Sequence, residues 1–415
     1  MTLTRRHSVS IRPGMFSTRD KLGHTRKRKA ISHSFSANSV SQFELYIGQN
    51  LSTFVSHWDR LSSLELQGTY SKLDALHWFN YLAFDIIGDL AFGKPFGMVA
   101  KGRDIAEIQL TPDSPITYAP AAEVLNRRGE VCATIGCLPA LKAWAKWLPD
   151  PFFTKGMNAI GNLAGMAVAS VNARLDASRA DNSSSQRVDL LERLMEGRDE
   201  QGNKFGREEL TAEALTQLIA GSDTIANTSC VMLYWVLSTP HVLPKLQAEL
   251  DAVIPAGVSV PSFAVVKDLP YLQAVINETL RIHSTSSLGL PRVVPVDGPG
   301  VDIFGHHFPG GTVLSVPSYT IHHSSDIWGA DAELFVPERW ERGVSEAQKC
   351  AFIPFSYGPR SCVGRNVADV ELALIGATLF RRYGFELYQR ELVTREGFLR
   401  KPLECKVGVR RRLNV

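Results

Sequence analysis

The stretch that decides the fold is Phe355-Ser-Tyr-Gly358-Pro-Arg360-Ser-Cys362-Val-Gly364. It is rich in turn-forming residues and leads into a predicted helix, so it delivers one cysteine to a helix N-terminus. There the helix dipole and free backbone N–H groups stabilise a thiolate. Gly358 and Gly364 permit backbone geometry that a Cβ would block, and Arg360 offers a cation for an anionic group beside the sulfur. The alternative is a buried, inert cysteine in a helix-capping loop.

The composition is that of an ordinary globular protein. The 415 residues are 44% hydrophobic and 21% charged, and 45 Lys+Arg against 42 Asp+Glu leave a net charge of +3. So small an excess gives no indication of nucleic acid or of a membrane surface as a partner. The six cysteines form no CxxC pair, which indicates reduced thiols rather than a zinc site or disulfides. They are Cys132, Cys137, Cys230, Cys350, Cys362 and Cys405.

The hydrophobic pattern predicts a mainly α fold with a minor β part, in a single domain over residues 1–415. Short β-like runs separated by Gly and Pro begin only after Pro291. The longest predicted helix, 208–238, starts with two acidic residues, which suit the positive end of the helix dipole. The other predicted helices are 20–35, 43–61, 73–92, 152–177, 241–254, 271–283 and 363–383.

Two further motifs carry charged residues in a helical context. Glu278 and Arg281 lie three residues apart on one helix face, where they can pair, although such pairs are usually solvated surface ion pairs. Ala220-Gly-Ser-Asp-Thr224 lies midway along the longest helix. A Gly and an acid in an apolar stretch break the local rule for helices, and such violations often mark functional sites. The alternative is a Gly for close helix packing with Asp223 on a solvated face.

The basic run His24-Thr-Arg-Lys-Arg-Lys29 admits three interpretations. It can be a nucleic-acid or targeting patch, a solvated helix face, or a docking surface for an acidic partner. The near-neutral chain disfavours the first of these. The histidine pairs at 306–307 and 322–323 lack nearby carboxylate or cysteine spacing, which favours surface or packing roles over a metal site.

The cysteine segment matches the cytochrome P-450 heme-binding signature, F-x-x-G-x-R-x-C-x-G, at all five specified positions. Chance would give about one such match in ten thousand chains of this length. On this resemblance the chain is identified as a member of that family, which implies the cytochrome P-450 fold and heme b. The resemblance makes Cys362 the axial ligand of the heme iron. The remaining cofactor-binding positions of this segment are Phe355, Gly358, Arg360 and Gly364.

The resemblance also assigns roles elsewhere in the chain. The family pairs its E-x-x-R motif with an arginine of a later P-E-R-W segment, here residues 337–340. This implies a structural ion network of Glu278, Arg281 and Arg339. It makes Asp223 and Thr224 the residues that deliver protons, with Ala220 and Gly221 beside the substrate. It directs His24, Arg28 and Arg292 toward the heme propionates, and Lys27 and Lys29 toward an acidic electron donor.

Four segments resemble fungal benzoate 4-monooxygenases: residues 24–37, 77–98, 125–136 and 283–292. The resemblance implies para-hydroxylation of benzoate with O₂ and two electrons from NADPH, delivered by an NADPH-cytochrome P-450 reductase. We expect the hydroxyls of Thr285 and Ser286 to bind the substrate carboxylate. The alternatives are hydroxylation or O-demethylation of another aromatic compound, an inactive heme-binding remnant, and a basic binding protein without heme.

The first 14 residues contain no apolar run, so they are neither a signal peptide nor a transmembrane helix. Members of the family are longer at the N-terminus, with a membrane anchor, the first β-strands and a loop over the substrate pocket. We therefore expect a truncated, monomeric chain in which the strands after Pro291 lack partners. For the full-length family the resemblance implies the cytosolic face of the endoplasmic reticulum membrane.

Overall fold

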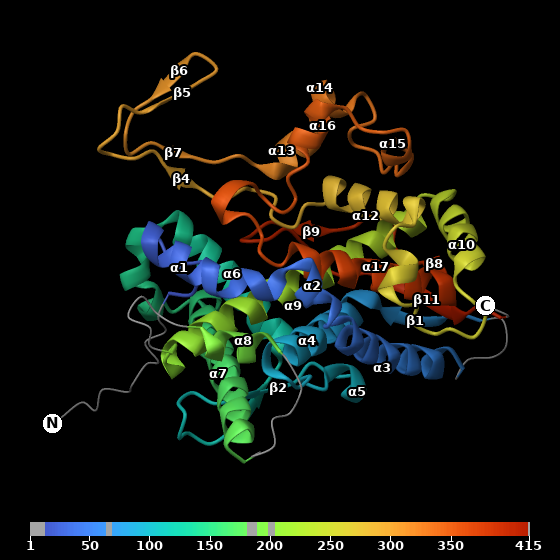
Figure 1. Ribbon diagram of the computed structural model, residues 1–415, viewed down its shortest axis with the longest axis horizontal. Helices are drawn as coiled ribbons and strands as arrows, with labels where there is room; N and C mark the ends of the chain where they lie inside the picture. Colours follow the sequence, from blue (N-terminus) through green and yellow to red (C-terminus); the bar gives the residue numbers. More distant parts are fainter. Residues whose placement is uncertain (1–12, 64–68, 181–188, 198–203, 414–415) are drawn as a thin grey trace.

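The computed structural model describes residues 13–63, 69–180, 189–197 and 204–413. It is mainly helical, with few and short strands (Figure 1). The α-helices are α1 (Lys21–Ser32), α2 (Ala37–Ser41), α3 (Glu44–Ser63), α4 (Ala75–Phe92), α5 (Met98–Lys101), α6 (Ala121–Cys137), α7 (Pro151–Ala180), α8 (Leu190–Glu196), α9 (Arg207–Ser238), α10 (Val242–Val253), α11 (Phe263–Val266), α12 (Pro270–Ile282), α13 (Ser318–His322), α14 (Ser325–Trp328), α15 (Glu338–Glu341), α16 (Glu346–Ala351) and α17 (Arg365–Arg382).

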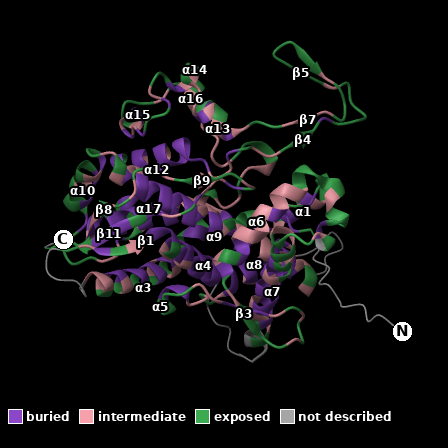
Figure 2. Ribbon diagram, turned by 180° about the vertical axis from the view of Figure 1, so that it is seen from behind, coloured by how far each residue is buried: buried purple, intermediate pink, exposed green. Residues whose placement is uncertain are grey.

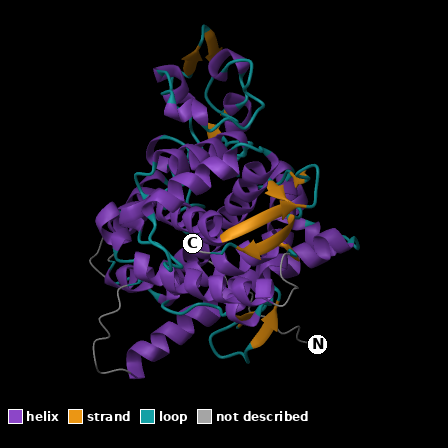
Figure 3. Cartoon of the chain, turned by 90° about the vertical axis from the view of Figure 1, so that its right-hand side faces the viewer, coloured by secondary structure: helices purple, strands orange, loops and turns teal. Residues whose placement is uncertain are grey.

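The strands form small antiparallel sheets. The three-stranded sheet has the order β1-β11-β8, with Ser71 opposite Val409 and Val409 opposite Phe385; Figure 3 shows it on one side of the helical body. The others are two-stranded: β2 with β3, β4 with β7, β5 with β6, and β9 with β10. The strands are β1 (Ser71–Asp74), β2 (Ala106–Ile108), β3 (Thr117–Ala119), β4 (Arg292–Val293), β5 (Val301–Ile303), β6 (His306–Phe308), β7 (Val313–Leu314), β8 (Tyr383–Leu387), β9 (Thr394–Arg395), β10 (Lys401–Pro402) and β11 (Lys406–Arg411).

Helix α9 passes through the middle of the body and packs along α4 (Figure 1). Most of its residues from Leu210 to Val236 are buried, because apolar residues lie on all its faces. Gly221 allows the close approach to α4, since a Cβ there would lie 2.6 Å from Cδ1 of Ile87. One hydrophobic cluster extends from Met15 to Val409 and surrounds these two helices.

The segment from β4 to β7 extends away from the helical body (Figure 1), and Figure 2 shows the β5 region largely exposed. Its apolar side chains face solvent: Val293 is 61% exposed, Val313 62% and Phe304 99%. Among the described residues, β4 and β7 pair only with each other, and so do β5 and β6. The expectation that the strands after Pro291 lack partners is wrong for β11, which pairs with β1 from the first part of the chain.

The predicted long helices agree with the structure to within about two residues at most ends. The segment 73–92 differs, because residues 71–74 form strand β1 and the helix begins only at Ala75. The long helix α6 was not among the predicted helices. In the described part of the chain, no helix has the length and apolar character needed to cross a membrane.

Candidate active site

The cysteine loop joins α16 to α17 and folds on its own backbone. The N–H of Cys362 donates to the carbonyl of Phe355 over 2.8 Å, which closes the loop. Gly358 begins a single 3₁₀ turn with φ +75°, a left-handed conformation that favours glycine. Gly364 is the residue before α17, so Cys362 lies just ahead of the helix N-terminus, as the sequence predicts.

Cys362 is exposed, yet the surrounding protein is dense enough for desolvation to raise the pKa of its thiol. The N–H of Gly364 and the charge of Arg28 act in the opposite direction and lower that pKa. Desolvation outweighs them, although the Gly364 N–H just before α17 favours the thiolate, in the direction that the sequence predicts. A metal cation bound to this sulfur would hold the thiolate, because a coordinating thiol is deprotonated outright. An accessible sulfur within dense protein is the arrangement that a large, sulfur-ligated cofactor requires.

Helix α1 places a cluster of basic side chains beside this loop. Arg28 donates from Nη1 to the carbonyl of Ser361 over 2.7 Å. His24 is buried, and desolvation together with the charges of Arg360 and Arg28 lowers its pKa. His24, Arg28 and Arg360 therefore lie close together. Neither arginine has an ion pair with a carboxylate in the described part of the chain, so the cluster is suited to an external anion.

Arg292 is not part of this cluster. It is exposed on β4, and its Nη1 donates to the carbonyls of Leu290 and Pro291 over 3.2 and 3.1 Å. The described residues show no hydrogen bond or ion pair that joins it to His24, Arg28 or Arg360.

The middle of α9 has an open face. Ala220 is exposed and Thr224 half-buried, although the helix around them is mostly buried. The Thr224 hydroxyl donates to the carbonyl of Ala220 over 2.7 Å. The Cβ direction of Gly221 is filled by Ile87 of α4, so Gly221 has the packing role that the sequence also offered, and its contact with substrate stays a prediction.

Asp223 is buried and ion-paired, not solvated. Its carboxylate contacts Nζ of Lys401 on β10 and accepts a hydrogen bond from Nδ2 of Asn227 over 3.1 Å. Lys401 also donates to Oδ1 of Asn126 on α6 over 2.8 Å. Sequence reasoning missed Lys401 and Asn126, since neither belongs to a motif and both are distant from Asp223 in the chain.

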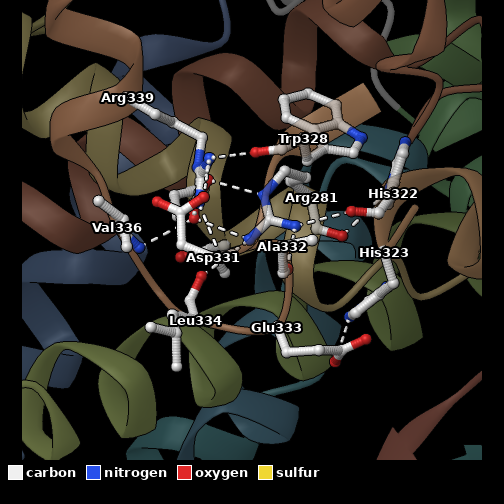
Figure 4. A network of polar contacts seen from close by, with 12 residues as sticks. Arg281, His322, His323, Trp328, Asp331, Ala332, Glu333, Leu334, Val336 and Arg339 are labelled. Carbon is white, nitrogen blue, oxygen red and sulfur yellow. Dashed lines mark hydrogen bonds and ion pairs between the residues drawn. The ribbon is translucent and has the colours of Figure 1, made fainter. Parts of the chain in front are cut away.

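Glu278, Arg281 and Arg339 form one buried network (Figure 4). Arg281 donates from Nε and Nη2 to the two carboxylate oxygens of Glu278, over 2.9 and 2.8 Å. Arg339 donates from Nε to Oε1 of Glu278 over 3.0 Å, and the indole N–H of Trp340 reaches the other oxygen over 2.9 Å. The fully buried carboxylate thus has two cationic partners.

This network also reaches the cysteine loop through His322. Nη1 of Arg281 donates to the carbonyl of His322 over 2.7 Å. The N–H of Ile353 donates to Nε2 of His322 over 3.0 Å, two residues before Phe355. Burial and the nearby charge of Arg281 lower the pKa of His322 to about 4, so its ring is neutral and accepts this bond. The network therefore fixes the start of the loop that carries Cys362.

The remaining predicted groups lie on α1 and in the segment after α12. Lys27 is buried and paired with Glu209 and Glu213 of α9, over 2.7 and 2.9 Å, so the expectation that it faces an electron donor is wrong. Lys29 is exposed. Thr285 and Ser286 are half-buried; their carbonyls accept from Arg400 N and Ser318 Oγ, and no hydrogen bond of their hydroxyls occurs among the described residues.

A family model described as Cytochrome P450 matches residues 4–409, nearly the whole chain. The chain belongs to the cytochrome P450 family. The P450 fold is also seen in the crystal structure of a cytochrome P450 (CYP102L1). That structure matches with a TM-score of 0.73 and 22% identity over 96% of this chain and 81% of the other.

Curated P450 relatives come from fungi. "Benzoate 4-monooxygenase bphA" of Aspergillus niger is 60% identical over 408 residues, which are 97% of this chain and 78% of the relative. A "Cytochrome P450 monooxygenase" of Aspergillus terreus is 30% identical over 394 residues, 93% of this chain and 76% of the relative. The chain is thus a heme-dependent P450 monooxygenase, which uses O₂, an organic substrate and electrons that a reductase passes on from NADPH.

The residues present fit a heme. Cys362 offers an accessible sulfur, the cationic pair Arg28 and Arg360 lacks carboxylate partners among the described residues, and Ala220 and Thr224 leave a mid-helix face uncovered. A porphyrin needs these three things: an axial ligand, counter-charges for its propionates and an open distal face. Helix α1 contacts the cysteine loop through Arg28 and Ser361, and the middle of α9 offers the uncovered face.

Proposed function

We propose that this chain hydroxylates benzoate at the para position, with the overall balance benzoate + O₂ + NADPH + H⁺ giving 4-hydroxybenzoate, water and NADP⁺. The observation that carries the proposal is the 60% identity to the Aspergillus niger benzoate 4-monooxygenase over 97% of the chain. The accessible Cys362 at the start of α17 supports it, because this chemistry requires a thiolate-ligated heme.

We propose that Cys362 is the axial ligand of the heme iron, within a loop built by Phe355, Gly358 and Gly364. The heme supplies the oxygen-activating chemistry, and an axial thiolate favours O–O cleavage. The basic residues proposed to hold the propionates are His24, Arg28, Arg360 and Arg292. The support is geometric for the first three, whereas Arg292 rests on the family resemblance alone.

On the distal side, we propose that Thr224 and Asp223 pass protons toward the reacting oxygen. The Thr224 hydroxyl lies on the open face of α9 and donates to the carbonyl of Ala220 in its own helix. We propose that Ala220, Thr285 and Ser286 line the substrate space, where a hydroxyl can donate to the benzoate carboxylate. Replacing Thr285 and Ser286 by Ala is expected to weaken benzoate binding.

The direct test is product formation by purified protein with a P450 reductase, NADPH and benzoate. We expect 4-hydroxybenzoate from the parent protein and none from Cys362→Ser. Cys350→Ser is the matched control, because Cys350 is also exposed and lies on α16 of the same region. Undiminished product from Cys362→Ser would overturn the heme-ligand assignment.

The substrate class is tested separately by titrating small aromatic acids and following the spin-state change of the heme. Benzoate is expected to give the change at the lowest concentration. 4-Methoxybenzoate tests O-demethylation, which the same oxidising chemistry performs. A response to neutral aromatics but not to benzoate would contradict the substrate proposal and leave the P450 assignment intact.

We further propose that residues 1–415 form one monomeric domain. The single main hydrophobic cluster that runs from Met15 to Val409 supports one domain. For a form that carries a membrane anchor, the family resemblance supports the cytosolic face of the endoplasmic reticulum. Light scattering of the purified protein tests the monomer, and a dimer mass would contradict it.

A further inference from the structure

A buried ion pair joins the middle of α9 to the C-terminal hairpin β9–β10. The carboxylate of Asp223 is 5% exposed and contacts Nζ of Lys401. The Lys401 side chain is only 16% exposed. A pair of this kind is a fixed contact, because losing one partner leaves an uncompensated charge inside the protein.

Helix α6 holds Lys401 in place from the other side. Its Asn126 accepts from Lys401 over 2.8 Å. Arg395, directly opposite Lys401 in the hairpin, is ion-paired with Glu130, one helical turn after Asn126. The hairpin is thus attached to α6 at two points, and the ammonium of Lys401 is fixed between α6 and α9.

This contact determines where the Asp223 carboxylate points. Consecutive residues of a helix project about 100° apart. The Thr224 hydroxyl lies on the open face of α9, at the carbonyl of Ala220. The Asp223 carboxylate is directed instead to Lys401 and Asn227. A proton can therefore pass from Asp223 to the side of Thr224 only if one or both carboxylate oxygens turn away from Lys401.

We propose that Lys401 is a positioning residue that controls proton delivery through Asp223. Lys401 thereby sets the fraction of NADPH electrons that go into hydroxylated product rather than into hydrogen peroxide. In the productive reaction, substrate, O₂, NADPH and H⁺ give hydroxylated product, water and NADP⁺. In the unproductive one, O₂, NADPH and H⁺ give hydrogen peroxide and NADP⁺. The inference rests on the proposed role of Asp223 and deepens it.

The experiment compares heme-loaded Lys401→Met, Lys401→Arg, Asp223→Asn and the double variant Asp223→Asn/Lys401→Met. In Lys401→Met we expect the product formed per NADPH to fall by about tenfold, which is less than the roughly 10²–10⁴-fold that a positioned acid–base group contributes, because Lys401 acts only through Asp223. Peroxide should rise in compensation, and the solvent deuterium isotope effect on product formation should change. Lys401→Arg, which keeps the charge, should retain most of the coupling.

Arg395→Met is the matched control. It breaks the other attachment of the same hairpin to α6 but does not touch Asp223. If Lys401 acts through Asp223, Arg395→Met keeps normal coupling, and the double variant behaves like Asp223→Asn alone. Equal loss of coupling in Arg395→Met, or additive losses in the double variant, would overturn the inference, because either result indicates a merely structural hairpin.

Thermal unfolding gives a readout that does not depend on turnover. Lys401→Met should lower the unfolding midpoint, and the added Asp223→Asn change should restore part of the loss by removing the unpaired charge. A double variant less stable than Lys401→Met contradicts the pairing. The inference is separable from benzoate hydroxylation, since coupling and peroxide can be measured with any aromatic substrate that shifts the spin state.

Discussion

Replacing Arg281 by Lys tests whether the ion network holds the site through geometry or through charge alone. Arg281 is fully buried, and all five N–H groups of its guanidinium have an acceptor. Besides Glu278, it donates to the carbonyls of His322 and Ala332, both over 2.7 Å, and of Leu334 over 2.9 Å. Lysine keeps the charge but has only three donors.

The expected loss follows from counting acceptors. At least two of the five lose their donor in Arg281→Lys, and each buried group left unsatisfied costs about 1–3 kcal/mol. The total of about 2–6 kcal/mol is a large part of the 5–15 kcal/mol that stabilises a typical protein. Because the His322 carbonyl is one of these acceptors and its ring holds the N–H of Ile353, the cysteine loop should loosen as well.

The assay is urea unfolding followed by circular dichroism, with heme retention measured from the CO-difference spectrum of the reduced protein. Arg342→Lys is the control, since Arg342 is exposed in the same region and a surface change of this kind is worth about 0.5 kcal/mol or less. An Arg281→Lys protein with the unfolding midpoint and heme content of the parent would refute the donor-counting argument.

Four further predictions concern single residues. Gly358→Ala should lower the free energy of unfolding by about 1–2 kcal/mol from backbone strain alone, because φ is +75° and a Cβ would meet nothing within 4 Å. Gly305→Ala is the control, since Gly305 has φ +79° and the same open space. It should cost as much stability in urea unfolding but leave heme retention unchanged. Lys27→Met should destabilise by about 3–5 kcal/mol, since it leaves Glu209 and Glu213 without their buried partner. Lys29→Met should leave stability unchanged but raise the reductase concentration needed for half-maximal turnover, most clearly at low salt; equal reductase dependence of both proteins would contradict this. Burial raises the pKa of Glu371 from 4.5 to about 8, so the folded protein still holds a proton at pH values where the unfolded chain has released it. The free energy of unfolding should therefore fall as the pH rises between these two values, by up to about 5 kcal/mol. Glu371→Gln should abolish this part of the pH dependence.

The sequence predicted the helices well because their signal is local. Helices α3 and α12 show a clear apolar periodicity within the helix itself, and such a pattern can be found without knowing the tertiary contacts. Strand β1 could not be found in this way. Its four residues, Ser71–Asp74, pair with β11 near the C-terminus, and nothing within so short a segment indicates a partner so distant.

The site was predictable where it depends on a motif and not where it depends on contacts. The cysteine loop has its chemistry in consecutive residues, and its position before α17 agrees with the prediction. Lys27 was misplaced because a run of basic residues does not tell which side of its helix another helix covers. The packing role of Gly221 could not be decided from the sequence for a similar reason, since only the structure shows Ile87 opposite it.

Local irregularities occur in the two segments that the site proposal uses. Ser356 has φ +60°, a conformation unusual for a residue with a Cβ, within the loop that presents Cys362. Ala220 is exposed in the middle of a buried helix. Asp223, in the same helix, is a charge inside the protein, held by Lys401 from a distant hairpin. A strained backbone and a buried charge cost stability, and such costs persist where function requires them. A sequence motif singles out the cysteine loop and another the middle of α9, so these structural irregularities support the same two segments by an independent route.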